Sequence, residues 1–268
     1  MHSHHSHSGE FCKHASSTLN EVLARAYELN FTHFHLSEHV PRFRNQDLYP
    51  EEEEAGFTPV ELEKQFRSYL DAQYEVMQRL RPEVIGHMDL FRLFDPDAPW
   101  IPDASTLAGK AILEKMERNV RFAASYGALF EANSSAFRKG WRHETYPGYV
   151  FLQKIKAMKG RIALSDDSHG TGQVALNFAR LRTYLLKEDI REIWYLMPGT
   201  PPNIPHDVSA SFEELETERH VRERSEFPGL NAPDHFPRGT RAVCLSGWES
   251  APFWDTLPAE LQTPITPM

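Results

Sequence analysis

The stretch YVFLQKIKAMKGRIALSDDSHG, residues 149–170, decides the fold class because it predicts a helix, a strand and a polar loop in succession. Residues 149–159 are predicted to be helical and to end at Gly160, a residue that often closes helices. Residues 161–165 (RIALS) are predicted to form a strand, and the polar run DDSH, residues 166–169, follows where that strand ends. This order of elements is typical of parallel α/β folds.

The same alternation extends over most of the chain. Further strands are predicted at residues 31–37, 83–87, 128–132 and 191–196. Helices are predicted at residues 17–30, from 58 to about 82, at 105–126 and at 173–187; Thr18 and Glu21 form a capping signal for the first of them. Strands that alternate with helices predict an α/β fold with a parallel sheet, open or closed into a barrel.

The character of the chain changes after Met197. Four prolines fall at positions 198–205, a charged stretch follows, and the periodicity of helices and strands is lost. We therefore predict a main domain over residues 1–197 and an irregular C-terminal extension over residues 198–268. The apolar residues between 242 and 254 are expected to dock on the main domain.

Composition narrows the function classes for these 268 residues. No run of about 18 apolar residues predicts a membrane span, and the polar N-terminus does not have the pattern of a signal peptide. Two distant cysteines, Cys12 and Cys244, build no disulfide framework, which favours the cytoplasm. The net charge of -9 argues against a nucleic-acid or membrane partner. No oligomeric state is indicated.

Histidines and carboxylates stand at the ends of the predicted strands. Near the N-terminus, His5 and His7 are two residues apart, so on an extended chain both imidazoles share one face. The other such residues are Glu38, His39, His87, Glu131, Asn133, Asp166, Asp167 and His169. Because the carboxyl ends of parallel strands share one face of the fold, these side chains are expected to converge there.

This set of side chains predicts a metal centre. Imidazole and carboxylate ligands together suit zinc, iron or manganese. Several such ions close together would suit in-line attack of water on a phosphate ester. A neighbouring cation would hold the phosphate, and Arg138, Lys139 and Arg42 are the candidates.

Several candidates have a structural alternative. Turn formation could explain His87, Asp166 could cap its loop so that one of the two aspartates binds metal, and Asn133 could fix a loop. Arg138 and Lys139 could be surface charges. Packing could explain His33 and His35, and Cys12 beside His14 is a weak zinc pair.

Five motifs, in order, resemble those of the polymerase and histidinol phosphatase (PHP) family. They are HSHSGEFCKHA from residue 5, LSEHVP from residue 36, VIGHMDL from residue 84, FEANSSAFRK from residue 130 and SDDSHG from residue 165. Together they cover the chain from about residue 2 to residue 196. The third and fourth are most similar to histidinol phosphatases, including those of fungi.

The resemblance implies a distorted (β/α)7 barrel that binds two or three divalent metal ions at its carboxyl face. It implies hydrolysis of L-histidinol phosphate to L-histidinol and phosphate in histidine biosynthesis, and it gives Arg138 a contact with the phosphate. Asp167 and His169 are also assigned to catalysis, and Glu38 and Glu131 are further candidate ligands. The implied metal ligands are His5, His7, His14, His39, His87, Asp167 and His169.

One departure from the family pattern falls within residues 42–81. The family carries there a strand that ends in a metal-bridging glutamate, and a G-S-V-H type motif, whereas this chain has an acidic loop and one helix. The predicted barrel is therefore incomplete, with about six strands. Two alternatives to the histidinol-phosphate reaction stay open: a catalytically impaired metal-binding remnant, and a phosphoesterase that acts on another substrate.

Overall fold

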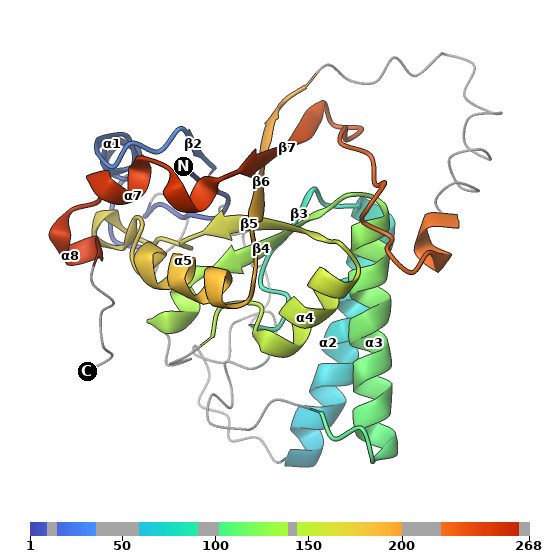
Figure 1. Cartoon of the computed structure of the whole chain (residues 1–268). Helices are drawn as coiled ribbons and strands as arrows, with labels where there is room; N and C mark the ends of the chain where they lie inside the picture. Colours follow the sequence, from blue (N-terminus) through green and yellow to red (C-terminus); the bar gives the residue numbers. More distant parts are fainter. Residues whose placement is uncertain (10–14, 36–58, 91–101, 139–143, 200–220, 263–268) are drawn as a thin grey trace.

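The computed structural model describes residues 1–9, 15–35, 59–90, 102–138, 144–199 and 221–262, and these ranges form a mixed α/β fold (Figure 1). The helices are α1 (Leu19–Glu28), α2 (Pro59–Leu80), α3 (Leu107–Ser125), α4 (Tyr149–Ala157), α5 (Phe178–Lys187), α7 (Phe253–Thr256) and α8 (Ala259–Gln262). The strands are β1 (His2–Ser3), β2 (His33–Phe34), β3 (Val84–Ile85), β4 (Leu129–Asn133), β5 (Arg161–Ser165), β6 (Glu192–Pro198) and β7 (Thr240–Ser246).

Five of the strands form a parallel run in the order β2-β1-β5-β4-β3. The strands β3, β4 and β5 pair in parallel, and β1 pairs in parallel with β2. The chain that follows β1 joins the two groups, because His4 N–H donates to Leu164 O (3.1 Å) and Asp167 N–H donates to His5 O (2.9 Å). The parallel sheet expected from the sequence is thus confirmed, and its carboxyl ends lie together.

The last predicted strand, at residues 191–196, does not extend this run. It forms β6, which pairs antiparallel with β7 over its whole length, from Glu192 opposite Ser246 to Pro198 opposite Thr240. Residues 240–262 were expected to be irregular outside the docking patch, and instead they begin with this seven-residue strand. The prediction missed β7 because its sequence, TRAVCLS, alternates weakly between polar and apolar residues.

The helices cover the sheet in the way the apolar spacing predicts. Helices α2 and α3 lie side by side (Figure 1), where Asn119 donates to Leu70 O (2.8 Å) and Lys115 pairs with Asp71. Thr18 caps α1 through the predicted box with Glu21. No helix within the described ranges is both long and apolar enough to cross a bilayer.

Helix α5 begins later than the sequence predicts, at Phe178 and not near residue 173. Residues 171–173 form a short 3-10 turn, and Ala175 and Asn177 have positive φ values of 61° and 64°, which break a right-handed helix. Ala175 N–H donates to the buried carboxylate of Asp166 (2.8 Å). This bond stabilises the turn and delays the helix.

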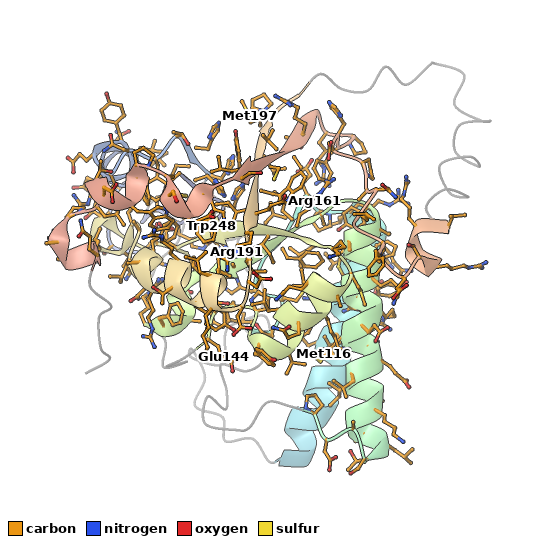
Figure 2. The ribbon with its side chains drawn as sticks, viewed as in Figure 1. Met116, Glu144, Arg161, Arg191, Met197 and Trp248 are labelled. Carbon is orange, nitrogen blue, oxygen red and sulfur yellow. The ribbon has the colours of Figure 1, made fainter. Side chains whose placement is uncertain are left out.

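The C-terminal residues dock through a cluster of aromatic rings. Trp248, labelled in Figure 2, is fully buried, and its ring lies 5.9 Å from that of Trp254 in an edge-on arrangement. Phe253 continues the cluster to Phe31, which follows α1, and to Phe178 of α5. We call Phe31, Phe178, Trp248, Phe253 and Trp254 the aromatic cluster; it joins both ends of the described chain to one core.

A buried histidine joins β5 to β6. His4 Nδ1 lies 3.2 Å from Leu164 O, and Leu196 N–H donates to His4 Nε2 (3.2 Å), so the ring is neutral with its proton on Nδ1. Burial, assisted by the nearby His35, lowers the pKa of His4 from 6.5 to about 3. The fold therefore resists protonation of this ring.

Acid is accordingly expected to destabilise the wild-type chain more than the His4→Gln variant, whose amide can still donate and accept. Between pH 6.5 and the lowered pKa of His4, the unfolded state binds one more proton than the fold, so stability falls as the pH falls. The difference should reach about 1.4 kcal/mol on going from pH 7.5 to 5.5. Urea unfolding at both pH values measures it, and equal losses for the two proteins would refute the assignment.

Candidate metal centre

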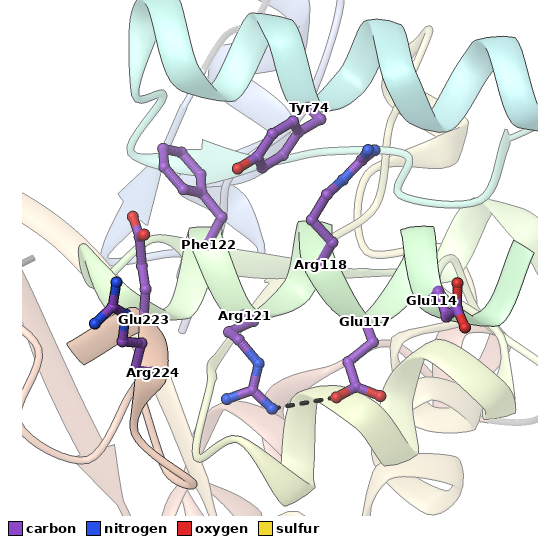
Figure 3. Close-up of a pocket in the computed structure, with 8 residues that line it drawn as sticks. All are labelled: Tyr74, Glu114, Glu117, Arg118, Arg121, Phe122, Glu223 and Arg224. Carbon is purple, nitrogen blue, oxygen red and sulfur yellow. Dashed lines mark hydrogen bonds and ion pairs between the residues drawn. The ribbon is translucent and has the colours of Figure 1, made fainter. Parts of the chain in front are cut away.

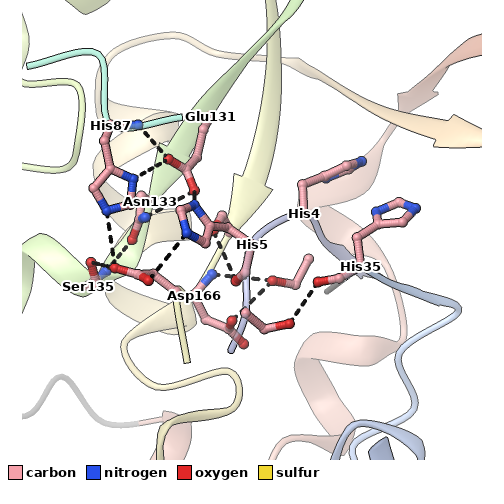
Figure 4. A network of polar contacts seen from close by, with 12 residues as sticks. His4, His5, His35, His87, Glu131, Asn133, Ser135 and Asp166 are labelled. Carbon is pink, nitrogen blue, oxygen red and sulfur yellow. Dashed lines mark hydrogen bonds and ion pairs between the residues drawn. The ribbon is translucent and has the colours of Figure 1, made fainter. Parts of the chain in front are cut away.

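Histidine and carboxylate side chains from four strands meet at the carboxyl ends of the parallel run (Figure 4). His5 and His7 follow β1, and His87 follows β3. Glu131 belongs to β4, while Asp167 and His169 follow β5. The expected convergence of these residues is therefore present in the structure.

Among the described residues, two groups of three side chains could each hold a metal ion, and they share Asp167. The first triad is His5, His87 and Asp167, and the second triad is His7, Asp167 and His169; within each, the ligand atoms lie within 4.8 Å of one another. Such overlap is the arrangement expected of two adjacent cation positions with one common carboxylate.

The distances assign the two oxygens of Asp167 to different neighbours. Oδ2 lies 3.3 Å from His87 Nε2. Oδ1 lies 3.3 Å from His7 Nε2, 3.5 Å from His5 Nε2 and 3.7 Å from His169 Nδ1. His5 Nε2 and His7 Nε2 are themselves 2.9 Å apart, so the two triads are in contact.

Glu131 orients two of the histidines through their Nδ1 atoms. Its Oε1 lies 2.8 Å from His5 Nδ1, and its Oε2 lies 3.3 Å from His87 Nδ1 and accepts the His87 backbone N–H (2.8 Å). A carboxylate that binds Nδ1–H leaves Nε2 available as a ligand atom, the usual outer partnership of metal-binding histidines. Glu131, a candidate ligand in the sequence, contacts Nδ1 of both rings and joins neither triad.

The electrostatics of the site favour positive charge at this place. Burial opposes the charged form of His87, but Glu131 and Asp167 outweigh burial and raise the pKa of His87 to about 10. Burial would also raise the pKa values of Glu131 and Asp167, yet the surrounding histidines hold both well below their usual range. Two buried carboxylates remain ionised here, and their field stabilises a cation.

The residues present fit a divalent metal ion. They combine imidazole nitrogens with carboxylate oxygens, a donor set that suits zinc, iron or manganese better than calcium or magnesium. Glu131 already orients His5 and His87 with Nε2 toward Asp167. Access exists from one side, because the side chains of His5 and His87 are 19% and 18% exposed while that of Asp167 is 1% exposed.

Replacing Glu131 by Gln is expected to weaken metal binding by about 10- to 100-fold, the usual effect of removing an outer partner. The amide keeps the size of the side chain but cannot hold the Nδ1 protons of both His5 and His87. Manganese titration followed by calorimetry measures the change. Glu260→Gln, on the exposed side of α8, is the control, and equal affinities for the two variants would count against the orienting role.

The backbone at the site also departs from ordinary strand ends. Both His87 and Asp167 have a φ of 48°, a left-handed conformation that is uncommon outside glycine and that clusters at functional sites. A Cβ at Gly86 would lie 3.2 Å from Glu131 Oε2 and 3.5 Å from His5 Nδ1. Gly86 thus leaves room for the carboxylate; the sequence contained it in VIGHMDL, but no role was predicted for it.

The adjacent aspartates have different roles, as the alternative for Asp166 anticipated. The Asp166 carboxylate accepts bonds from Ser3 Oγ (3.1 Å), Ser168 N–H (3.2 Å) and Ala175 N–H (2.8 Å), so it shapes the loop. Asn133 likewise accepts from Ser135 N–H (2.7 Å) and donates to Glu131 Oε1 (3.0 Å).

The remaining predicted residues fall into three groups. Arg138 donates to the backbone carbonyls of Asp166 and Asp167, beside the centre, and its contact with a phosphate stays a prediction. The predicted residues that lie outside the described ranges are Cys12, His14, Glu38, His39, Arg42 and Lys139. His33 and His35 pack against Tyr195 and His4, respectively.

A separate cavity of about 490 Å³ contains no triad residue (Figure 3). Two of its arginines are already engaged: Arg118 pairs with Asp71, and Arg121 bonds Glu117 and Ser225 O. The lining residues are Tyr74, Glu114, Glu117, Arg118, Arg121, Phe122, Glu223 and Arg224.

Comparison with known proteins was made by family, by sequence and by structure. No family model matches the chain. A Schizosaccharomyces pombe protein named "Probable histidinol-phosphatase" is 30% identical over 284 residues, which cover 75% of this chain and 91% of the relative. The Saccharomyces cerevisiae histidinol-phosphatase is 24% identical over 306 residues, covering 73% and 90%.

One solved structure also aligns with the chain. It is of a Listeria monocytogenes protein provisionally named a histidinol phosphatase, with a TM-score of 0.48, 14% identity and coverage of 67% of this chain and 99% of that one. The similarity of sequence to the yeast relatives carries the assignment: the chain belongs to the PHP family and, within it, to the histidinol-phosphatase-like proteins.

Proposed function

We propose that this chain is a metal-dependent phosphomonoester hydrolase that converts L-histidinol phosphate and water to L-histidinol and phosphate, in histidine biosynthesis. The observation that carries the proposal is Asp167, whose carboxylate belongs to both triads. Two adjacent cation positions suit hydrolysis of a phosphate ester, since charge develops on both the entering and the leaving oxygen. The names of the two yeast relatives supply the substrate.

The first triad and the second triad would hold the ions, which when bound supply a Lewis acid and a water of lowered pKa. His169 donates from Nδ1 to Asp167 O (2.9 Å), which fixes the ring and leaves Nε2 available to the reaction. Asp167 holds the histidines of both triads around one carboxylate. In the reaction the water oxygen bonds to phosphorus, the ester P–O bond breaks, and the leaving oxygen takes up a proton.

Arg138 is the described residue that we propose for contact with the substrate phosphate. Burial lowers the pKa of its guanidinium while Asp167 and Asp166 oppose that effect, so it stays a cation beside the centre. Two of its nitrogens bind backbone carbonyls, but a guanidinium has five N–H donors, and the others can serve a phosphate. Lys139 and Arg42 keep the same proposed role.

We infer that the five parallel strands belong to an incomplete PHP barrel, open between β2 and β3. The main domain would end near residue 197, with β7 and residues 248–254 as its C-terminal attachment. The alignment with the S. pombe relative supports the absence of a family segment within residues 42–81. The alignment is 284 positions long, but it includes only 75% of this chain of 268 residues. The relative therefore has positions without a counterpart in this chain.

Phosphate release from L-histidinol phosphate, with manganese or zinc added, tests the proposal. The purified wild-type protein should release phosphate, and the His5→Ala/His7→Ala double variant should not. His235→Ala, at an exposed histidine, serves as the matched control and should keep wild-type activity. Absence of release by folded wild-type protein would refute the active enzyme.

Because a family segment is missing, an alternative proposal is a catalytically impaired metal-binding remnant of the family. Metal analysis separates the two: two or more tightly bound ions per chain favour the enzyme, and one or none favours the remnant. Running the assay beside other phosphomonoesters, such as nucleotides, tests the third reading, a phosphoesterase with another substrate. Preference for L-histidinol phosphate is the expected outcome.

A further inference from the structure

Residues 133–138, at the end of β4 and directly after it, contact carboxylates of the metal centre without belonging to either triad. Asn133 donates to Glu131 Oε1 (3.0 Å), and Ser135 Oγ donates to Asp167 Oδ2 (2.9 Å). Arg138 donates to the backbone on either side of that aspartate's Cα. Of these, the hydroxyl of Ser135 touches the one carboxylate that both triads share (Figure 4 labels Ser135).

The bond from Ser135 distinguishes the two oxygens of Asp167. Oδ2 accepts this hydroxyl and faces His87 Nε2 at 3.3 Å, while Oδ1 faces His7, His5 and His169. Ser135 is fully buried and Asp167 is 1% exposed, so water does not compete for the same oxygen. A carboxylate oxygen has two lone pairs, so it can accept a hydrogen bond from a hydroxyl and bind a cation at the same time.

The hydroxyl also limits rotation of the carboxylate. Rotation about the last bond of an aspartate side chain is broad, so a fixed orientation needs a hydrogen-bond partner. The turn that carries Ser135 is itself held, because Asn133 accepts the Ser135 N–H (2.7 Å) and pairs by its backbone with Tyr146. Ser135 thus acts from a preorganised position.

We propose that Ser135 is a positioning residue that directs Oδ2 of Asp167 to His87 of the first triad. The role rests on the proposed metal centre and names a residue that neither triad contains. Loss of the hydroxyl should therefore weaken the first triad, whose His87 faces Oδ2, and leave the second triad, whose two histidines face Oδ1, nearly unchanged. A residue that merely supported the fold would affect both triads alike.

The test compares Ser135→Ala with Ser134→Ala in two backgrounds. Ser134 is the matched control: it is equally buried, and its hydroxyl donates to Leu176 O (2.7 Å), away from the carboxylates. His169→Ala retains the complete first triad, and His87→Ala retains the complete second triad. Manganese affinity of each protein is measured by titration, with the thermal midpoint as a check on folding.

We expect Ser135→Ala to weaken manganese binding by about 10- to 100-fold in the His169→Ala background and by less than about threefold in the His87→Ala background. Ser134→Ala should change neither affinity by more than about threefold. Equal losses in both backgrounds, or no loss in the first, would overturn the positioning role. If neither parent variant binds manganese, the metal centre and this role fail together; if both bind but the wild type releases no phosphate, the proposed function alone fails.

Discussion

Replacing Asp167 by Asn is expected to remove both bound ions and to lower phosphate release on the order of 10³-fold, as loss of a central electrostatic group does. Asp167 is the one residue common to the two triads, so a single substitution disables both cation positions. The amide is neutral and offers one oxygen where the carboxylate offers two. It also leaves His87, whose pKa the two carboxylates raise to about 10, with less compensation for its charge.

Metal content by mass spectrometry and phosphate release from L-histidinol phosphate measure this outcome. Asp189→Asn is the control, because that aspartate also has a positive φ but its side chain is 73% exposed and remote from the triads. The control should match the wild type in both assays. An Asp167→Asn protein that keeps one ion per chain would show that one triad binds without this carboxylate, and the shared-ligand arrangement would be wrong.

Trp248→Ala is expected to destabilise the fold by about 3–5 kcal/mol, the usual cost of emptying a buried tryptophan site. The side chain is fully buried, and Trp254 packs edge-on against it and donates from Nε1 to its carbonyl oxygen. Removing the ring leaves a cavity in the aromatic cluster and loosens the contact of residues 248–254 with Phe31 and Phe178. This loss is a large fraction of the free energy of unfolding of a typical domain.

Urea unfolding followed by far-UV circular dichroism measures the loss. Tyr27→Ala, at an aromatic side chain that is 84% exposed, is the control and should change the free energy of unfolding by less than about 0.5 kcal/mol. A cooperative transition at the wild-type midpoint for Trp248→Ala would mean that the C-terminal residues are not part of the folding unit.

The sequence predicted the parts of the site that depend on position along a strand. His87 and Asp167 converge because each stands at the carboxyl end of a predicted parallel strand, and that placement follows from helix and strand spacing. For His5 and His7 the sequence predicted two imidazoles on one face, but not the strand β1 before them. Helices α1 to α4 begin and end within a few residues of the predicted bounds, since caps and apolar periodicity mark them.

What the sequence could not predict depends on contacts between distant residues. Nothing in DDSH tells which aspartate receives three loop hydrogen bonds and which faces the histidines; Ser3 and Ala175 decide it. The orienting role of Glu131 depends on contacts with the Nδ1 atoms of His5 and His87, which follow other strands. Gly86 is needed because a Cβ at this position would lie close to the Glu131 carboxylate. Strand β7 was also not predicted, because it forms by pairing with the distant strand β6.

The bonds between the residues after β1 and the carboxyl end of β5 have a consequence for synthesis of the chain. His4 and His5 bond residues 164 and 167, so the first strand cannot take its place until about 160 further residues exist. At roughly 5–20 residues per second, the N-terminal histidines wait on the order of ten seconds or more after they leave the ribosome. Contacts of such long range close late and slow the search for the native state. A nascent chain interrupted before residue 167 would contain three of the four triad histidines and no metal centre.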